Sequence, residues 1–269
     1  MKYTIKTPYG ATKVYQNKGG DNGCILVVPG FSESILHNQP LVDCLAKDGG
    51  YDVFTFDQPR RGPAHHPIDR QKAIIVSALE HVLPNGDSVH AIAHSLGSVA
   101  LLRAAATQPE RFLSLFLMQP PGIYSQQGLF RLARRVSRKS YNNHFYAIRK
   151  NPSVPTSLKR VVRSQLASSG HVLKNPRLAL KEANFARRTD LLEDLSAVQA
   201  LGIPTHIMNA HSDELFGNTH LLEYEQIIEL VGPHSSVLDE HAGHDTSWLH
   251  PERTTETVSA FIRHTNGRT

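Results

Sequence analysis

The chain has 269 residues, of which 40% are hydrophobic and 20% charged, a composition of folded globular proteins that excludes disordered and fibrous classes. It has no apolar run of the roughly 18 residues that a transmembrane helix needs, no signal-peptide pattern, and too few cysteines, Cys24 and Cys44, for a disulfide framework, so we expect a cytoplasmic protein. The net charge of +5 is uneven, because 15 Lys and Arg stand against two acids between Ile123 and Asp190.

Strand and helix patterns alternate over the first 122 residues. Two short runs, Lys2–Lys6 and Thr12–Gln16, predict a hairpin, and apolar, β-branched runs predict buried strands. The expected strands are Cys24–Val28, Tyr51–Phe56, Val89–Ala93 and Phe112–Met118, and the expected helices are Pro40–Lys47, Asp69–Leu83 and Ser95–Thr107. This alternation predicts an α/β fold with a mostly parallel sheet and helices on both faces.

After Gly122 the alternation stops, and residues 123–189 show helical patterns broken by Pro and Gly but no convincing buried strand. It resumes at Asp190, where Asp190 and Glu193 have the spacing of a capping box. The later expected elements are a helix to about Leu201, the strand Thr205–Asn209, the helix His220–Leu230, the strand Ser236–Leu238 and a helix over Glu252–Arg263. We therefore expect a core domain made of residues 1–122 and 190–269, with 123–189 as an inserted basic, helical cap.

One segment carries the strongest chemical signal. The predicted strand that begins at Val89 ends in Ala93-His94-Ser95-Leu96-Gly97, and the next predicted helix follows directly. A serine in such a sharp turn needs small residues two positions before and after it, and the turn raises its hydroxyl above the sheet at the positive end of the helix. The segment resembles the nucleophile elbow G-x-S-x-G of the α/β-hydrolase fold family, with Ala93 in place of the first glycine; a Ser95 that only caps the helix is the structural alternative.

The resemblance covers almost the whole chain and implies an oxyanion hole. In this family one donor is the backbone N–H after the nucleophile, here that of Leu96, and the other comes from the loop after the third strand. That loop, Val28-Pro29-Gly30-Phe31-Ser32-Glu33, is similar to the family's His-Gly-aromatic sequence, so Phe31 would supply the second N–H. Without the resemblance, Pro29-Gly30 is an ordinary turn. The segment that begins at Asp57 is similar to the family's Asp-x-Arg-Gly loop and is expected to be structural.

The resemblance also implies the acid and the base, because the family's chain order is Ser, Asp or Glu, then His. Asp213 follows the strand Thr205–Asn209 at the family's usual position, with Glu214 as the alternative. His244 ends an Ala-Gly-His sequence after the last strand, which favours it over His241. His244 would deprotonate the Ser95 hydroxyl and then protonate the leaving group, while Asp213 would orient the imidazole.

These residues predict a serine hydrolase that cleaves a small to medium carboxylic ester. Thioesterase, amidase and carbon–carbon bond hydrolase activities with the same triad remain alternatives, as does a ligand-binding protein without turnover. The basic charge of the cap is either only a solvated helix face, or it favours an anionic or lipid-like ester or contact with an anionic lipid surface; nucleic acid binding is not expected. No cofactor is implied, the 16 histidines show no metal-binding motif, and His94 is expected to be a packing residue.

Overall fold

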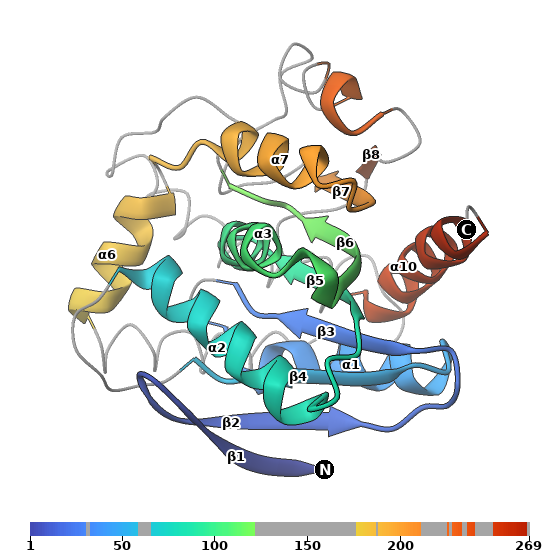
Figure 1. Cartoon of the computed structure of the whole chain (residues 1–269), viewed down its shortest axis with the longest axis horizontal. Coiled ribbons are helices and arrows are strands. Elements are labelled where there is room, and N and C mark those ends of the chain that lie inside the picture. Colours follow the sequence, from blue (N-terminus) through green and yellow to red (C-terminus); the bar gives the residue numbers. More distant parts are fainter. Residues whose placement is uncertain are drawn as a thin grey trace, which may run out of the picture.

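The computed structural model describes residues 1–30, 33–58, 66–121, 176–186, 188–210, 225, 228–232, 236–239 and 250–267. Their centre is an eight-stranded sheet of order β1-β2-β4-β3-β5-β6-β7-β8 (Figure 1). The strands are β1 (Lys2–Thr7), β2 (Gly10–Asn17), β3 (Cys24–Val28), β4 (Asp52–Phe56), β5 (Val89–His94), β6 (Phe112–Met118), β7 (Thr205–Ala210) and β8 (Ser236–Asp239). The hairpin β1–β2 joins β4 in antiparallel fashion, and all later pairs are parallel. The α/β fold with a mostly parallel sheet is confirmed.

Helices cover both faces of this sheet. They are α1 (Ile35–Lys47), α2 (Pro67–Val82), α3 (Gly97–Thr107), the short 3-10 helix η1 (Pro109–Arg111), α6 (Pro176–Ala186), α7 (Leu191–Ala200) and α10 (Pro251–Asn266). Helices α2, α3 and α7 lie on one face, and α1 and α10 on the other (Figure 1). Residues 225 and 228–230, inside the predicted helix His220–Leu230, are helical, as is residue 231 just beyond it.

The two cores follow from the alternation of side chains along each strand. In β3, Leu26 and Val28 belong to the core under α2 and α3, whereas Ile25 and Val27 belong to the core under α1 and α10. The other central strands divide in the same way, with Ala91 and Leu117 on the first face and Ile92 and Phe116 on the second. Because both faces are covered, the central strands are apolar throughout, which is why their sequences read as continuous hydrophobic runs.

Three predicted helix starts were wrong, and one of them is that of α2, which begins at Pro67, a proline in its first turn, rather than at Asp69. Helix α1 begins at Ile35 rather than Pro40, so that Pro40 lies inside the helix, where a proline normally removes one backbone hydrogen bond. The Asp57 carboxylate accepts a hydrogen bond from the Ile35 N–H at 2.8 Å, a long-range contact that the local pattern could not reveal. Helix α3 begins at Gly97 rather than Ser95, because the turn that precedes it takes up two residues. At Asp190 the N-cap half of the expected capping box is confirmed, since its Oδ1 accepts from the Leu192 N–H at 3.0 Å; the reciprocal bond from the Glu193 side chain is not among the contacts of this helix's described residues.

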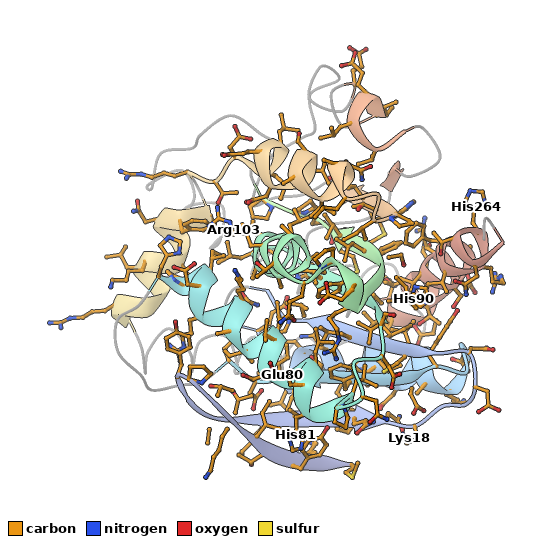
Figure 2. All side chains as sticks on the ribbon, viewed as in Figure 1. Lys18, Glu80, His81, His90, Arg103 and His264 are labelled. Carbon is orange, nitrogen blue, oxygen red and sulfur yellow. The ribbon has the colours of Figure 1, made fainter. Side chains whose placement is uncertain are left out.

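Only the end of the predicted cap, 123–189, lies among the described residues, so the division into core and cap stays a prediction. Helix α6 comes from this segment and lies beside α2 (Figure 1). The Phe185 ring at its end packs edge-on against the His66 ring, with centroids 4.7 Å apart, and lies 5.7 Å from the Arg103 guanidinium carbon. Arg103 of α3 also pairs with Asp194 of α7, so its side chain links α3 to both α6 and α7 (Figure 2).

No helix in the described ranges is long and apolar enough to cross a membrane. Within the same ranges, no group of three or more His, Cys, Asp or Glu side chains is arranged to hold a metal ion.

Candidate active site

Ser95 occupies a strained turn at the carboxyl end of β5. Its φ is 49°, in the left-handed region that residues with a side chain rarely adopt. The turn joins β5 directly to α3, with Leu96 as the residue before the helix, and the first N–H groups of a helix have no partner within it. A strained serine at a strand-to-helix junction has the geometry of a nucleophile elbow.

The neighbouring strand holds this turn in place through main-chain atoms. The Ser95 N–H donates to the Met118 carbonyl oxygen at 2.8 Å, and one strand further the Gln119 N–H donates to the Met208 carbonyl oxygen at 2.8 Å. Gln119 has a φ of 43°, and it and Ser95 are the two non-glycine residues with positive φ in the described part of the chain. The backbone strain is therefore concentrated at the carboxyl ends of two neighbouring central strands, β5 and β6.

Two glycines let the loop after β3 approach the elbow. A Cβ on Gly30 would lie 2.9 Å from the His94 carbonyl oxygen and 3.1 Å from the Ser95 Cβ, and one on Gly97 would lie 2.5 Å from the Pro29 carbonyl oxygen. Neither position has room for a methyl group without movement of the backbone. The 29–30 segment thus lies directly against the candidate nucleophile.

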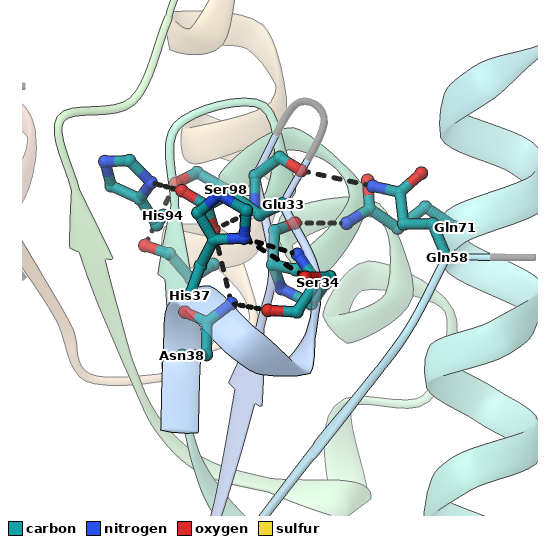
Figure 3. A network of polar contacts seen from close by, with 11 residues as sticks. Glu33, Ser34, His37, Asn38, Gln58, Gln71, His94 and Ser98 are labelled. Atoms are coloured by element: carbon teal, nitrogen blue, oxygen red, sulfur yellow. Dashed lines mark hydrogen bonds and ion pairs between the residues drawn. The ribbon is translucent and has the colours of Figure 1, made fainter. Parts of the chain in front are cut away.

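A buried polar network ties the same loop to the elbow (Figure 3). One carboxylate oxygen of Glu33 accepts hydrogen bonds from the Gly30 N–H at 2.7 Å and from the Asn38 side chain at 3.3 Å. The other oxygen pairs with Nδ1 of His94, the residue before Ser95. The Glu33 N–H also donates to the Gly30 carbonyl oxygen at 3.3 Å, so two contacts with the main chain of Gly30 and one with the side chain of His94 link Glu33 to the neighbours of the elbow.

Glu33 is ionised despite its burial. Burial by itself raises its pKa, but the charge and hydrogen bond of His94, the charge of His37 and the Gly30 N–H outweigh it and lower the pKa to about 2. With an ionised carboxylate as its partner, Nδ1 of His94 must carry the proton of the shared hydrogen bond.

Two glutamines hold the loop from its other side (Figure 3). The Gln71 side chain of α2 donates to the Pro29 carbonyl oxygen at 2.5 Å, and the Gln58 side chain donates to the Gly30 carbonyl oxygen at 3.2 Å. Gln58 and Glu33 thus bind both main-chain polar groups of Gly30, and Gln71 binds the carbonyl of the residue before it.

Two buried carboxamides end the neighbouring strands. Gln119 follows β6 and Asn209 lies near the end of β7, and the nitrogen and oxygen of both side chains have no hydrogen-bond partner in the described part of the structure. Buried amides without partners are rare in folded proteins, because they forfeit their hydrogen bonds to water. Their place beside Ser95 makes them candidates for contacts with substrate or with a neighbouring loop.

The structure describes two of the five predicted site residues. Ser95 and Leu96 lie at the elbow, whereas Phe31, Asp213 and His244 lie outside the described residues, as do the alternatives Glu214 and His241. The strands before them end at the same edge as Ser95, since Val28 pairs with Ala93 and Ala210 pairs with Asp239 in the parallel sheet. How Phe31, Asp213 and His244 lie relative to Ser95 stays a prediction.

Sequence reasoning missed the role of Glu33 and read His94 only as a packing residue. His94 is buried, as expected, but its Nδ1 also pairs with the Glu33 carboxylate. The available signal was an acid in an otherwise uncharged turn, together with a histidine directly before the serine. Neither feature predicts a pairing between residues that lie 61 positions apart.

These features together define an α/β fold with an elbow at the carboxyl edge of a parallel sheet. A sequence model of the alpha/beta hydrolase fold family matches residues 23–251, and the chain belongs to this family. No curated protein sequence matches it.

Solved structures agree on the fold. A bromoperoxidase from Bacillus anthracis has a TM-score of 0.73 at 17% identity, covering 98% of this chain and 100% of its own. A bacterial membrane phospholipase A gives 0.72 at 19% identity, with 99% and 86% covered. A thermophilic esterase from Thermogutta terrifontis gives 0.70 at 18% identity, with 98% and 99% covered. At such identities the likeness shows the fold and leaves the substrate open.

Proposed function

We propose that this protein is a serine hydrolase that cleaves a carboxylic ester through an acyl-enzyme on Ser95. The observation that carries the proposal is the strained Ser95 at the carboxyl edge of the sheet, against the loop after β3. His244 acts as general base, Asp213 orients it, and the N–H groups of Leu96 and Phe31 stabilise the oxyanion. Attack by the Ser95 oxygen on the ester carbonyl forms the acyl-enzyme and releases the alcohol; a water activated by His244 then releases the acid.

A fluorophosphonate probe tests the nucleophile, because it phosphonylates only an activated serine. We expect wild-type protein to be labelled, and Ser95→Ala and His244→Ala to remain unlabelled. Ser114→Ala is the matched control, since Ser114 is equally buried but lies toward the other end of the sheet, hydrogen-bonded to His90 at 2.8 Å. Folded wild-type protein that resists the probe would instead favour a ligand-binding protein without turnover.

The substrate class is proposed from charge. Residues 123–189 are strongly basic, which favours an ester with an anionic or lipid-like acyl group. The fold neighbours include a phospholipase A and an esterase, which supports this class without deciding it. A panel of p-nitrophenyl esters, with neutral and carboxylate-bearing acyl groups of matched length, tests the preference. Equal kcat/KM for both series at low and high salt would remove the argument from charge.

Contact with an anionic lipid surface is the corresponding partner proposal. Binding to vesicles that contain phosphatidylserine should weaken steeply as the salt concentration rises, and vesicles of phosphatidylcholine alone should not bind. Binding that is absent or independent of salt would exclude this role for the basic segment.

A further inference from the structure

The Glu33 carboxylate is a costly side chain to bury beside the candidate site. It is 7% exposed, and an ionised carboxylate loses much of its hydration at such a position. An apolar side chain of similar volume would avoid this cost but would leave the buried Gly30 N–H without an acceptor. A charged residue at this position therefore calls for a role beyond packing.

The contacts of Glu33 join the two segments that an acyl-transfer site must align. One oxygen holds the Gly30 N–H, in the loop expected to supply an oxyanion donor, and the other holds His94, next to the candidate nucleophile. Since Glu33 occupies the Gly30 N–H, that group is not available to an oxyanion. The next N–H along the chain is that of Phe31, the proposed donor.

We propose that Glu33 is a positioning residue, which locks the loop after β3 to the nucleophile elbow so that the oxyanion donors and Ser95 keep a fixed separation. The inference rests on the proposed hydrolase function. Its physical basis is reach, because the Glu33 side chain is long enough for its two carboxylate oxygens to contact Gly30 and His94 at the same time. Misplacing a donor by a fraction of an ångström weakens the transition state far more than the bound substrate.

Three substitutions at position 33 separate reach from charge. Glu33→Gln keeps the length and an acceptor for the Gly30 N–H, and its amide can donate to His94 if the imidazole changes tautomer. Glu33→Asp keeps the charge but shortens the side chain by one carbon–carbon bond. Glu33→Met keeps the length but has no carboxyl or amide group, so the Gly30 N–H loses its acceptor.

The readouts are kcat and KM for a p-nitrophenyl ester, and the rate of fluorophosphonate labelling of Ser95, each corrected for the folded fraction. We expect Glu33→Gln to keep kcat within about fivefold of wild type, and Glu33→Asp and Glu33→Met to lose at least about 30-fold, which is somewhat less than the loss of a whole oxyanion donor. KM should change by less than about threefold in all three, because the lost interaction is specific to the transition state.

His90→Leu is the control for general loosening of β5. His90 is buried at the other end of the same strand and pairs with Ser114, so its loss should lower the melting temperature and leave kcat unchanged (Figure 2). If Glu33→Asp does not fold, the comparison of Glu33→Gln with Glu33→Met decides, since neither buries a charge.

A Glu33→Asp or Glu33→Met enzyme as active as Glu33→Gln would overturn the inference, and so would an equal loss of kcat in His90→Leu. Either result leaves the hydrolase proposal intact, because that proposal depends on labelling of wild-type Ser95. If the fluorophosphonate probe does not label wild-type Ser95, both the hydrolase proposal and the inference about Glu33 are overturned.

Discussion

The backbone N–H of Ser95 donates to the carbonyl oxygen of Met118 across 2.8 Å, so the strand ladder between β5 and β6 continues into the strained turn. This bond helps hold φ of Ser95 at 49°, where a side chain costs on the order of 1 kcal/mol relative to glycine. We therefore expect Ser95→Gly to be more stable than Ser95→Ala by about 1 kcal/mol, although both lose the candidate nucleophile. Urea unfolding of the two variants measures this difference. Equal stabilities would mean that the turn relaxes when the hydroxyl is absent.

Substitution at Gly97 should be costly for stability and activity together. An added methyl group would lie 2.5 Å from the Pro29 carbonyl oxygen and 3.0 Å from that of Val28, so the loop after β3 must move away from the elbow. We expect Gly97→Ala to lose about 2 kcal/mol of stability and at least about tenfold in kcat. Gly267→Ala is the control, because its methyl group would meet no atom closer than 3.5 Å and its φ is −80°. Its stability should stay within about 0.5 kcal/mol of wild type.

The buried His206 predicts loss of stability in mild acid. It lies in β7, with its ring centroid 4.8 Å from that of Phe116 and 5.1 Å from that of Phe261, and burial lowers its pKa from 6.5 to about 4. Below pH 6.5, His206 of the unfolded chain binds a proton, whereas His206 of the folded protein binds one only when the pH nears 4. The free energy of unfolding therefore falls as the pH is lowered from 6.5 to 4.

His206→Phe should remove this contribution, because phenylalanine does not titrate. Among the described residues, neither ring nitrogen of His206 has a hydrogen-bond partner that the substitution would remove. Between pH 7.5 and pH 5, the variant should lose about 2 kcal/mol less free energy of unfolding than wild type. The residual decline belongs partly to His90, whose pKa burial also lowers to about 4. If the free energies of unfolding of wild type and His206→Phe fall in parallel as the pH is lowered, the His206 imidazole is not desolvated in solution.

The ion pair between Arg103 and Asp194 should contribute more than the exposed pair between Lys18 and Asp52. Both Asp194 oxygens accept from Nε of Arg103, at 3.0 and 3.1 Å, and the Asp194 side chain is 16% exposed. Lys18, by contrast, is 70% exposed, and solvent screens its charge. We expect Asp194→Asn to cost about 0.5–1 kcal/mol and Lys18→Gln less than about 0.3 kcal/mol, with kcat unchanged in both. Thermal melts of both variants at low and high salt measure these losses. A larger loss for Lys18→Gln than for Asp194→Asn would contradict the prediction.

Local patterns predicted the elements well wherever burial on both faces left a continuous apolar run. The strands Cys24–Val28 and Phe112–Met118 were predicted at their observed bounds, and the elbow was placed correctly between β5 and α3. The start of α1 was mispredicted, because a proline usually marks the first turn of a helix, whereas Pro40 lies inside it.

The polar network around Glu33 was beyond local patterns for a different reason. It depends on the register between β3 and β5, and a sequence read on its own does not specify which strands become neighbours. Likewise, the amides of Gln119 and Asn209, which have no hydrogen-bond partner among the described residues, are recognised only when the carboxyl ends of β6 and β7 are placed side by side.

The main-chain hydrogen bonds that run past the ends of β5 and β6 also bear on directed evolution. Every non-proline residue carries the N–H and C=O groups that make these bonds, so they do not depend on which side chain is present. The Gln119 and Asn209 side chains make no hydrogen bond to the described part of the chain, so they can be exchanged while the scaffold beneath them keeps its register. Because both are buried and Gln119 has a positive φ, a library limited to polar residues no larger than these amides, with glycine included at 119 and with Glu33, Gly30 and Gly97 held constant, should yield folded variants and shift substrate preference rather than abolish expression.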